Sequence, residues 1–173
     1  MIETRMEEMS KHLKFIVFLG MYLPSLAAGQ PTIPRHDTAD VYIKERQFKL
    51  SGVSLGSSIR SAERVFGKPD SVASAEGVYA DTGRTYYFEG VEVCVDGNQV
   101  WTIRCKNPKH RTANGIRVGA SIARVFQTYG VTSKQPADKG YRVSYIVWPP
   151  SGAYLAFDII DGKVAQIVLD GEP

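Results

Sequence analysis

Two short segments of the chain carry apolar residues at helical spacing. In residues 122–129 the apolar positions fall at i, i+3, i+4 and i+7, which places them on one stripe of a helix. A weaker form of the same spacing occupies residues 59–66. The stripe residues are Ile122, Val125, Phe126 and Tyr129 in the stronger segment and Ile59, Ala62, Val65 and Phe66 in the weaker one. The pattern predicts a short helix over each segment.

A serine precedes each predicted helix and a glycine follows it. Ser58 and Ser121 come directly before the apolar stripes, where a side-chain oxygen can accept a hydrogen bond from a first-turn N–H group. Gly67 and Gly130 lie where a residue in the left-handed region would end each helix. The serines are also candidate nucleophiles, but no Gly-x-Ser-x-Gly sequence surrounds them. We therefore interpret them as helix caps.

Each predicted helix is followed by three strand-like runs. The six runs cover residues 85–89, 91–95, 100–105, 142–148, 154–160 and 164–169. Asp96-Gly97 and Asp161-Gly162 separate the last two runs of each set, and Asp-Gly is a strong signal for a two-residue hairpin turn. Apolar residues at positions 41, 43, 48 and 50 predict a leading strand as well.

The two helical segments are similar in sequence. Residues 52–59 align without a gap with residues 115–122, and self-similarity of this kind indicates a repeated unit. One such unit buries too little apolar surface to be stable alone. We therefore predict an α+β fold of two tandem repeats, each a short helix followed by a three-stranded antiparallel meander, which together form one pseudo-twofold domain. Repeat 1 covers about residues 41–105 and repeat 2 about residues 113–173, joined by residues 106–112.

The N-terminus carries the three parts of a secretory signal peptide, which are a basic start, a short apolar stretch and a small-residue exit. Basic residues precede an apolar run over residues 15–23, and Pro24 ends the run. The run is shorter than the about 20 apolar residues that a membrane-spanning helix needs. We therefore predict a signal peptide over residues 1–27 and no transmembrane helix, followed by a flexible, proline-containing leader over residues 28–40.

The cleavage site decides whether the mature chain carries an anchor. Small residues fit a cut after Ala27, which we favour, or a cut after Gly29. Met9 is an alternative start, because the acids at positions 3, 7 and 8 are unusual in a basic leader. Neither cut is followed by the cysteine that lipid attachment requires. The sequence thus predicts a mature protein without a lipid anchor, in the periplasm or outside the cell.

The composition is that of a folded and weakly basic chain. The 173 residues are 43% hydrophobic, which excludes a disordered chain. The 21 Lys and Arg against 18 Asp and Glu give a net charge of +3, too little to indicate a nucleic-acid-binding protein. A basic group near the linker comprises Arg104, Lys106, Lys109, His110 and Arg111. We interpret it as a solvated loop, with contact to a phosphate or an acidic partner as the alternative.

No sequence motif supplies the groups for catalysis, metal binding or cofactor binding. After removal of the signal peptide the histidines are His36 and His110, and they lack metal-ligand spacing. The glycines of residues 52–56 lack the Lys-Ser/Thr ending of a phosphate-binding loop. We therefore predict a protein that is not an enzyme and binds neither metal nor cofactor. The alternative is a small periplasmic hydrolase whose carboxylates have pKa values shifted apart by their surroundings. The candidate carboxylates are Glu89, Glu92 and Asp158.

Cys94 and Cys105 raise the question of a disulfide. An even number of cysteines in an exported protein favours a bond. Strand alternation argues against it, because Cys94 points away from the core if Val91, Val93 and Val95 face it, whereas Cys105 shares the core. A bulge would undo this register argument, so both states remain open. Without the bond, Cys94 is a free thiol on the open face and Cys105 a buried one.

An aromatic segment near residue 148 is the strongest candidate for recognition. Trp148 precedes Pro149 and Pro150, and a Trp beside two prolines forms a stiff protrusion of a kind favoured at interfaces. Four tyrosines are expected to extend this partner-binding surface: Tyr86, Tyr87, Tyr145 and Tyr154. In the alternative interpretation, Trp148 closes the edge of the core.

The spacing around the first predicted helix resembles that of a known family. Gly56 and Gly67 are eleven residues apart, with Ile59 three residues after the first and Pro69 two after the second. This pattern resembles the helix signature of the outer-membrane assembly lipoprotein (SmpA/OmlA) family. Two such units behind a signal peptide also resemble the secreted β-lactamase inhibitor protein family. That resemblance implies a duplicated helix-plus-sheet fold with a concave, aromatic-rich sheet face.

The sequence as a whole predicts an exported, non-enzymatic protein-binding module of the bacterial cell envelope. Its partner would be a protein of the envelope, met through a sheet face and the aromatic loop. A secreted enzyme is the alternative partner, and the chain would then be an inhibitor or an immunity protein.

Overall fold

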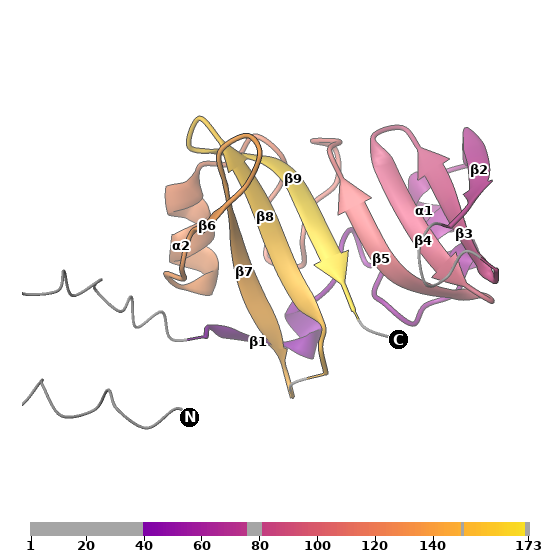
Figure 1. Ribbon diagram of the computed structural model, residues 1–173, viewed down its shortest axis with the longest axis horizontal. Helices are drawn as coiled ribbons and strands as arrows, with labels where there is room; N and C mark the ends of the chain where they lie inside the picture. The colour runs from indigo at the N-terminus through magenta and orange to yellow at the C-terminus, as the bar shows by residue number, and fades with distance from the viewer. Residues whose placement is uncertain (1–39, 76–80, 150, 172–173) are drawn as a thin grey trace, which may run out of the picture. The chain divides into compact units, whose positions relative to one another are not determined.

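The strands of the computed structural model, which describes residues 40–75, 81–149 and 151–171, form one nine-stranded sheet (Figure 1). The elements are β1 (Tyr42–Lys44), η1 (Glu45–Gln47), α1 (Ile59–Phe66), β2 (Ser71–Ser74), β3 (Gly83–Phe88), β4 (Val91–Asp96), β5 (Gln99–Cys105), α2 (Ile122–Tyr129), β6 (Gln135–Pro136), β7 (Tyr141–Trp148), β8 (Tyr154–Ile160) and β9 (Lys163–Asp170). The strand order is β1-β7-β8-β9-β5-β4-β3-β2, and β6 also pairs with β7. The pairs are antiparallel except for β1 with β7, which is parallel.

The predicted fold class, two repeats of a helix and a three-stranded meander, is wrong. The described strands belong to a single mixed sheet in which β5 and β9 pair directly, with Ile103 opposite Leu169. Two separate meanders would each leave an unpaired strand edge, and this pairing removes both edges. Short strands that the alternation did not predict, β2 and β6, extend the sheet, and the predicted leading strand is limited to β1 before the chain enters η1.

Both helices are short, and their ends show how the local sequence sets them. The Ser121 hydroxyl accepts a hydrogen bond from the Arg124 backbone N–H at 3.3 Å, as an N-cap does. Ser58 has the same extended backbone, but its hydroxyl lies 3.2 Å from that of Ser61 instead. The glycines that follow, Gly67 and Gly130, adopt φ of 94° and 97°, a region that L residues with side chains rarely adopt. Each helix therefore ends at its glycine.

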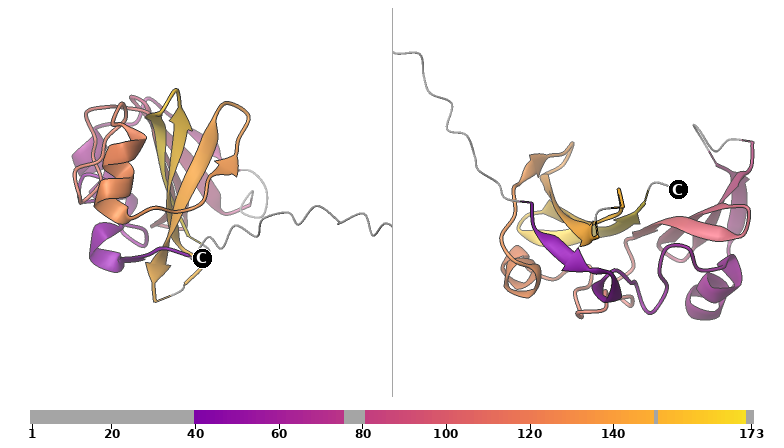
Figure 2. Two further views of the ribbon diagram at one scale, coloured as in Figure 1. Left: turned by 90° about the vertical axis from the view of Figure 1, so that its left-hand side faces the viewer. Right: turned by 90° about the horizontal axis from the view of Figure 1, so that it is seen from below.

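The helices and η1 all lie on one face of the sheet, and the hydrophobic core fills the space beneath them (Figure 2). An aromatic cluster forms the densest part of this core: Tyr129 of α2, Tyr145 of β7 and Phe157 of β8 have ring centroids 5.2–6.1 Å apart. Tyr145 and Phe157 have no exposed surface. The sheet bends away from the helices at both ends, so the opposite face is concave and no described element covers it (Figure 2).

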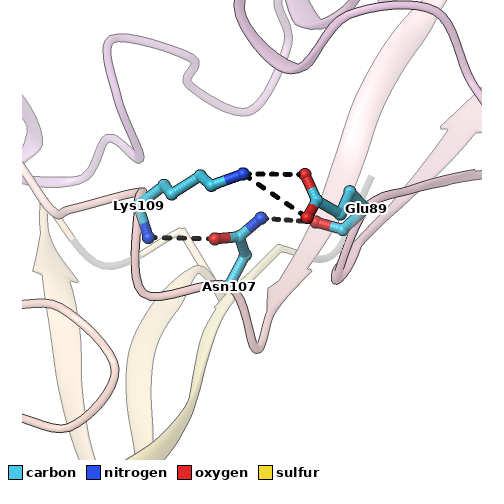
Figure 3. A network of polar contacts seen from close by, with 3 residues as sticks. All are labelled: Glu89, Asn107 and Lys109. Atoms are coloured by element: carbon cyan, nitrogen blue, oxygen red, sulfur yellow. Dashed lines mark hydrogen bonds and ion pairs between the residues drawn. The ribbon is translucent and has the colours of Figure 1, made fainter.

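The linker between the two halves of the chain is fixed by polar contacts (Figure 3). The side chain of Asn107 donates to the Glu89 backbone carbonyl at 2.7 Å and accepts from the Lys109 backbone N–H at 2.9 Å. The ammonium of Lys109 lies 3.0 Å from the Glu89 carboxylate, and both groups are well exposed. The ion pair therefore contributes little to stability, whereas the hydrogen bonds of the buried Asn107 hold the backbone of the linker.

The predicted signal peptide and nearly all of the predicted leader lie outside the described residues. Within the described ranges, no helix has both the length and the apolar character needed to cross a membrane.

Candidate functional site

The uncovered face of the sheet, here called the open face, presents alternate residues of neighbouring strands. Val143, Leu155 and Leu169 point into the core. The residues that alternate with them along the same strands therefore point toward the open face. The central residues of the open face are Arg142 and Ser144 from β7, Tyr154, Ala156 and Asp158 from β8, Gln166, Val168 and Asp170 from β9, Thr102 and Arg104 from β5, and Glu92 and Cys94 from β4. Residues that are distant in sequence thus meet on one surface.

A bidentate ion pair crosses two strands at one side of this centre. The Arg142 guanidinium donates to both oxygens of Asp158, at 2.6 and 3.0 Å. The two residues are opposite each other in the β7–β8 register. The hydrogen bond to Asp158 is the main reason that the pKa of Arg142 lies above its ordinary value. Two-point contact of this kind fixes the orientation of both side chains.

A second polar group of the open face centres on the carboxylate of Asp170. It accepts a hydrogen bond from the Thr102 hydroxyl at 2.5 Å and another from the Tyr154 hydroxyl at 2.7 Å. Burial, and then the hydrogen bond to Asp170, raise the pKa of Tyr154 to about 12. Tyr154 therefore stays protonated at neutral pH and acts as a hydrogen-bond donor, which leaves it unsuited to act as a base.

The floor between these polar groups consists of small side chains. Ala156 has no exposed surface, and Val168 and Cys94 are 2% and 5% exposed, although no described element lies over them. The side chain of Arg104 on the neighbouring strand contacts Cys94, with its Nη1 atom 3.9 Å from the sulfur. These three small side chains therefore offer almost no surface to a partner.

At one end of the open face, two exposed aromatic rings stand together. Tyr42 of β1 and Trp148 of β7 have ring centroids 5.4 Å apart in an edge-to-face arrangement. Tyr42 is 47% exposed and Trp148 is 58% exposed. The parallel pairing of β1 with β7 brings them together, because Tyr42 is opposite Ile146. Trp148 follows Ile146 by two positions and so lies on the same face of the sheet. We call Tyr42 and Trp148 the aromatic pair.

The residues predicted to bind a partner are divided by the structure. Trp148 and Pro149 are exposed. Tyr87 is on the open face and 37% exposed, and Tyr154 is half-buried in the polar centre of that face.

The other predicted residues are not available on this surface. Tyr86 points to the helix-covered face and packs against the core. Tyr145 is fully buried, and its hydroxyl donates to the Gly130 carbonyl at 2.8 Å, so it has no surface to offer. Pro150 lies outside the described residues.

Sequence reasoning missed Tyr42, the neighbour of Trp148. The signal available was alternation, since Ile43 is apolar between Tyr42 and Lys44 and faces the core in a strand. It also missed Asp170 and Thr102. Those two side chains meet only because β5 pairs with β9, a long-range pairing that no local pattern indicates.

The acids proposed for the hydrolase alternative are not grouped. Glu89 contacts Lys109, Asp158 contacts Arg142, and Glu92 stands on β4 in register with Arg104. Among the described residues, no three His, Cys, Asp or Glu side chains form a group that could hold a metal ion.

The basic group near the linker is also dispersed. Arg104 belongs to the open face, whereas His110 packs its ring edge-on against Phe66, with ring centroids 4.9 Å apart. The Nδ1 atom of His110 lies 3.2 Å from the Ser51 hydroxyl. Burial, and then the charge of Lys109, lower the pKa of His110. His110 therefore does not lie in one basic patch with Arg104.

The two cysteines are free thiols on opposite faces of the sheet. Cys94 is on the open face, as strand alternation predicted, and Cys105 is in the core. The β4–β5 register does shift between Cys94 and Val95, but it places Cys94 opposite Thr102 and Cys105 opposite Val91. Burial raises the pKa of Cys105.

We expect neither thiol to react quickly with Ellman's reagent in the native protein, because both side chains are at most 5% exposed. In denaturant both should react, giving two thiols per chain. Two unreactive cysteines in denaturant without a reductant would instead show a disulfide, and rapid reaction in the native state would contradict the burial.

Comparison with known proteins gives a likeness of fold. No family model and no curated protein matches the sequence. Among solved structures, the chain is similar to a cysteine-rich secretory protein from Staphylococcus aureus, with a TM-score of 0.52 at 12% identity, over 77% of this chain and 50% of that one. An extracellular protein containing an SCP domain from Bacillus anthracis gives 0.49 at 10% identity, over 68% and 44%. A DUF4309 family protein from Bacillus subtilis gives 0.37 at 14% identity, over 67% and 79%.

This chain thus spans about half the length of the first two structures. At such low identity the likeness concerns the fold alone, and of these three structures the one from Staphylococcus aureus has a TM-score above 0.5.

Proposed function

We propose that this chain is an exported, non-enzymatic binding module that recognises a protein of the bacterial cell envelope through its open face. The observation that carries the proposal is the aromatic pair, two large rings that stand half exposed beside the polar centre of a concave sheet face. Trp and Tyr rings of this kind supply much of the binding energy at protein interfaces. The signal-peptide pattern of residues 1–27 supports the exported location.

The polar centre of the open face supports binding in preference to catalysis. Its charged and hydroxyl groups satisfy one another, as Arg142 does with Asp158 and Asp170 does with Tyr154. General acid–base catalysis needs a group whose pKa lies near the working pH, and the pKa of Tyr154, about 12, is far from it. Exposed aromatic rings beside polar groups that are already satisfied are instead features of a recognition surface.

The test is capture of envelope proteins on the immobilised chain, followed by affinity measurement with the partner recovered. Trp148→Ala should weaken binding by roughly 2 kcal/mol or more, about 30-fold, because truncation of an aromatic anchor removes the surface that it buries against the partner. Tyr42→Ala should act in the same direction.

The matched control is Val131→Ala, since Val131 is 73% exposed and lies in the segment after α2, outside the strands that form the open face. This variant should bind as the unmodified chain does. If Trp148→Ala and Tyr42→Ala recover the same partner with unchanged affinity, the aromatic pair is not the binding site.

A further inference from the structure

The two ends of the sheet differ in how their strand edges are protected. At the β7 end, the outermost strands are β1, which is three residues long, and β6, which is two residues long. β6 contains Pro136, and β1 ends with the charged Lys44. Short strands, proline and lysine are the usual means of preventing an edge from pairing with another chain. At the other end, β2 has the sequence Ser-Val-Ala-Ser, with no charge and no proline, and all four of its side chains are exposed. Among the described strands, β2 pairs with β3 alone.

The register shows which backbone groups of β2 are directed outward. Ala75 donates to the Gly83 carbonyl at 3.0 Å, in the same register that pairs Ala73 with Thr85. Hydrogen-bonded and non-hydrogen-bonded pairs alternate along an antiparallel ladder. Ser71 and Ala73 therefore exchange hydrogen bonds with β3, whereas Val72 and Ser74 direct their N–H and C=O groups away from the sheet.

We propose that β2 pairs antiparallel with β2 of a second copy of this chain, around a twofold axis at Val72. In this register each Val72 forms the hydrogen-bonded pair with its counterpart, and the flanking pairs place Ser71 opposite Ala73. The Val72 side chain, now 48% exposed, then covers its counterpart on the helix side of the sheet. No like charges meet within Ser71–Ser74, because that segment carries none. A strand that is neutral and self-complementary in this way fits a second copy of itself.

The pairing is short, and this determines the kind of dimer. Three β2 residues from each chain, at positions 71–73, lie opposite one another in this register, and they bury less surface than the roughly 1,200–2,000 Å² of a typical stable interface. The dimer is therefore weak and depends on protein concentration. Because the twofold axis is perpendicular to the sheet, the two open faces lie on the same side of the continuous sheet.

The first test is sedimentation velocity over a wide range of concentration. The unmodified chain should associate to a dimer as its concentration rises. Val72→Pro should remain monomeric, because it removes an outward N–H group and leaves the hydrogen bonds between β2 and β3 intact. Val72→Lys should also remain monomeric, because it places two like charges opposite each other. Val131→Lys, with the same change at a distant exposed site, should dimerise normally.

The second test is covalent capture of the proposed register. In a hydrogen-bonded pair the Cα atoms are about 5.5 Å apart, within the range that a disulfide can bridge. Val72→Cys should therefore form a disulfide-linked dimer under mild oxidation, and Val131→Cys should not. Circular dichroism checks that the variants fold, and if Val72→Pro does not, Val72→Lys and Val72→Cys decide. A chain that is monomeric at all concentrations, or a dimer unaffected by Val72→Lys, would overturn the proposal.

Discussion

Replacement of Phe157 by alanine should lower the free energy of unfolding by about 3–5 kcal/mol, the range seen for aromatic residues removed from a core. Phe157 has no exposed surface, and its ring packs against Tyr129 and Tyr145, with centroid distances of 5.7 and 6.1 Å. These two rings come from α2 and β7 and are held by hydrogen bonds, from the Tyr129 hydroxyl to Thr112 and from the Tyr145 hydroxyl to Gly130. They cannot close the space that Phe157 leaves without losing those bonds.

Urea unfolding followed by tryptophan fluorescence measures this change. The matched control is Ile160→Ala, which removes an apolar side chain from the same strand at a site that is 38% exposed. Its effect should be much smaller. Equal losses for both variants would show that the sheet region around Phe157 is not the packed centre of the molecule.

Replacement of Asp170 by alanine should destabilise the chain by roughly 1–3 kcal/mol, because it leaves a buried donor unsatisfied. The Thr102 hydroxyl is completely buried and donates to Asp170 at 2.5 Å, while Tyr154 donates to the other carboxylate oxygen at 2.7 Å. Tyr154 is half-buried and can turn to water. The buried Thr102 hydroxyl cannot bond to water instead, so most of the loss of stability should come from this hydroxyl.

A double-mutant cycle isolates that contribution. Thr102→Val removes the donor with little change in shape, so Asp170→Ala should cost less in the Thr102→Val background than in the unmodified chain. Tyr154→Phe serves as the matched comparison and should reduce the cost by less. A cycle in which Thr102→Val does not alter the effect of Asp170→Ala would contradict the contact.

The parts of the fold that local sequence predicts are those that local geometry determines. The stripe of Val125 and Tyr129 lies on α2 and faces the core, and Gly130 ends that helix. Asp161 and Gly162 both have positive φ between β8 and β9, as a primed two-residue hairpin turn requires. Alternation likewise placed Cys94 on the open face. Each of these features depends on residues a few positions apart.

The parts that were not predicted depend on pairings between distant segments or on strands without a hydrophobic signal. Ser71–Ser74 is polar and fully exposed, so no alternation marks it as a strand. The pairing of β5 with β9 joins the two halves of the sequence and turns two predicted meanders into one sheet. The same long-range pairing assembles Asp170 with Thr102, and the parallel pairing of β1 with β7 assembles Tyr42 with Trp148. The prediction that Tyr145 belongs to the partner-binding surface was wrong, because the presence of an aromatic residue in a strand does not show whether its ring faces a partner or the core.

The position of β9 has a consequence for how the protein reaches its native state. β9 is the last described strand along the chain, yet it lies between β5 and β8 in the middle of the sheet. Until residues 163–170 have been synthesised, the earlier strands form two pieces with unprotected inner edges. Completion of the sheet must therefore wait until this segment can pair with both β5 and β8.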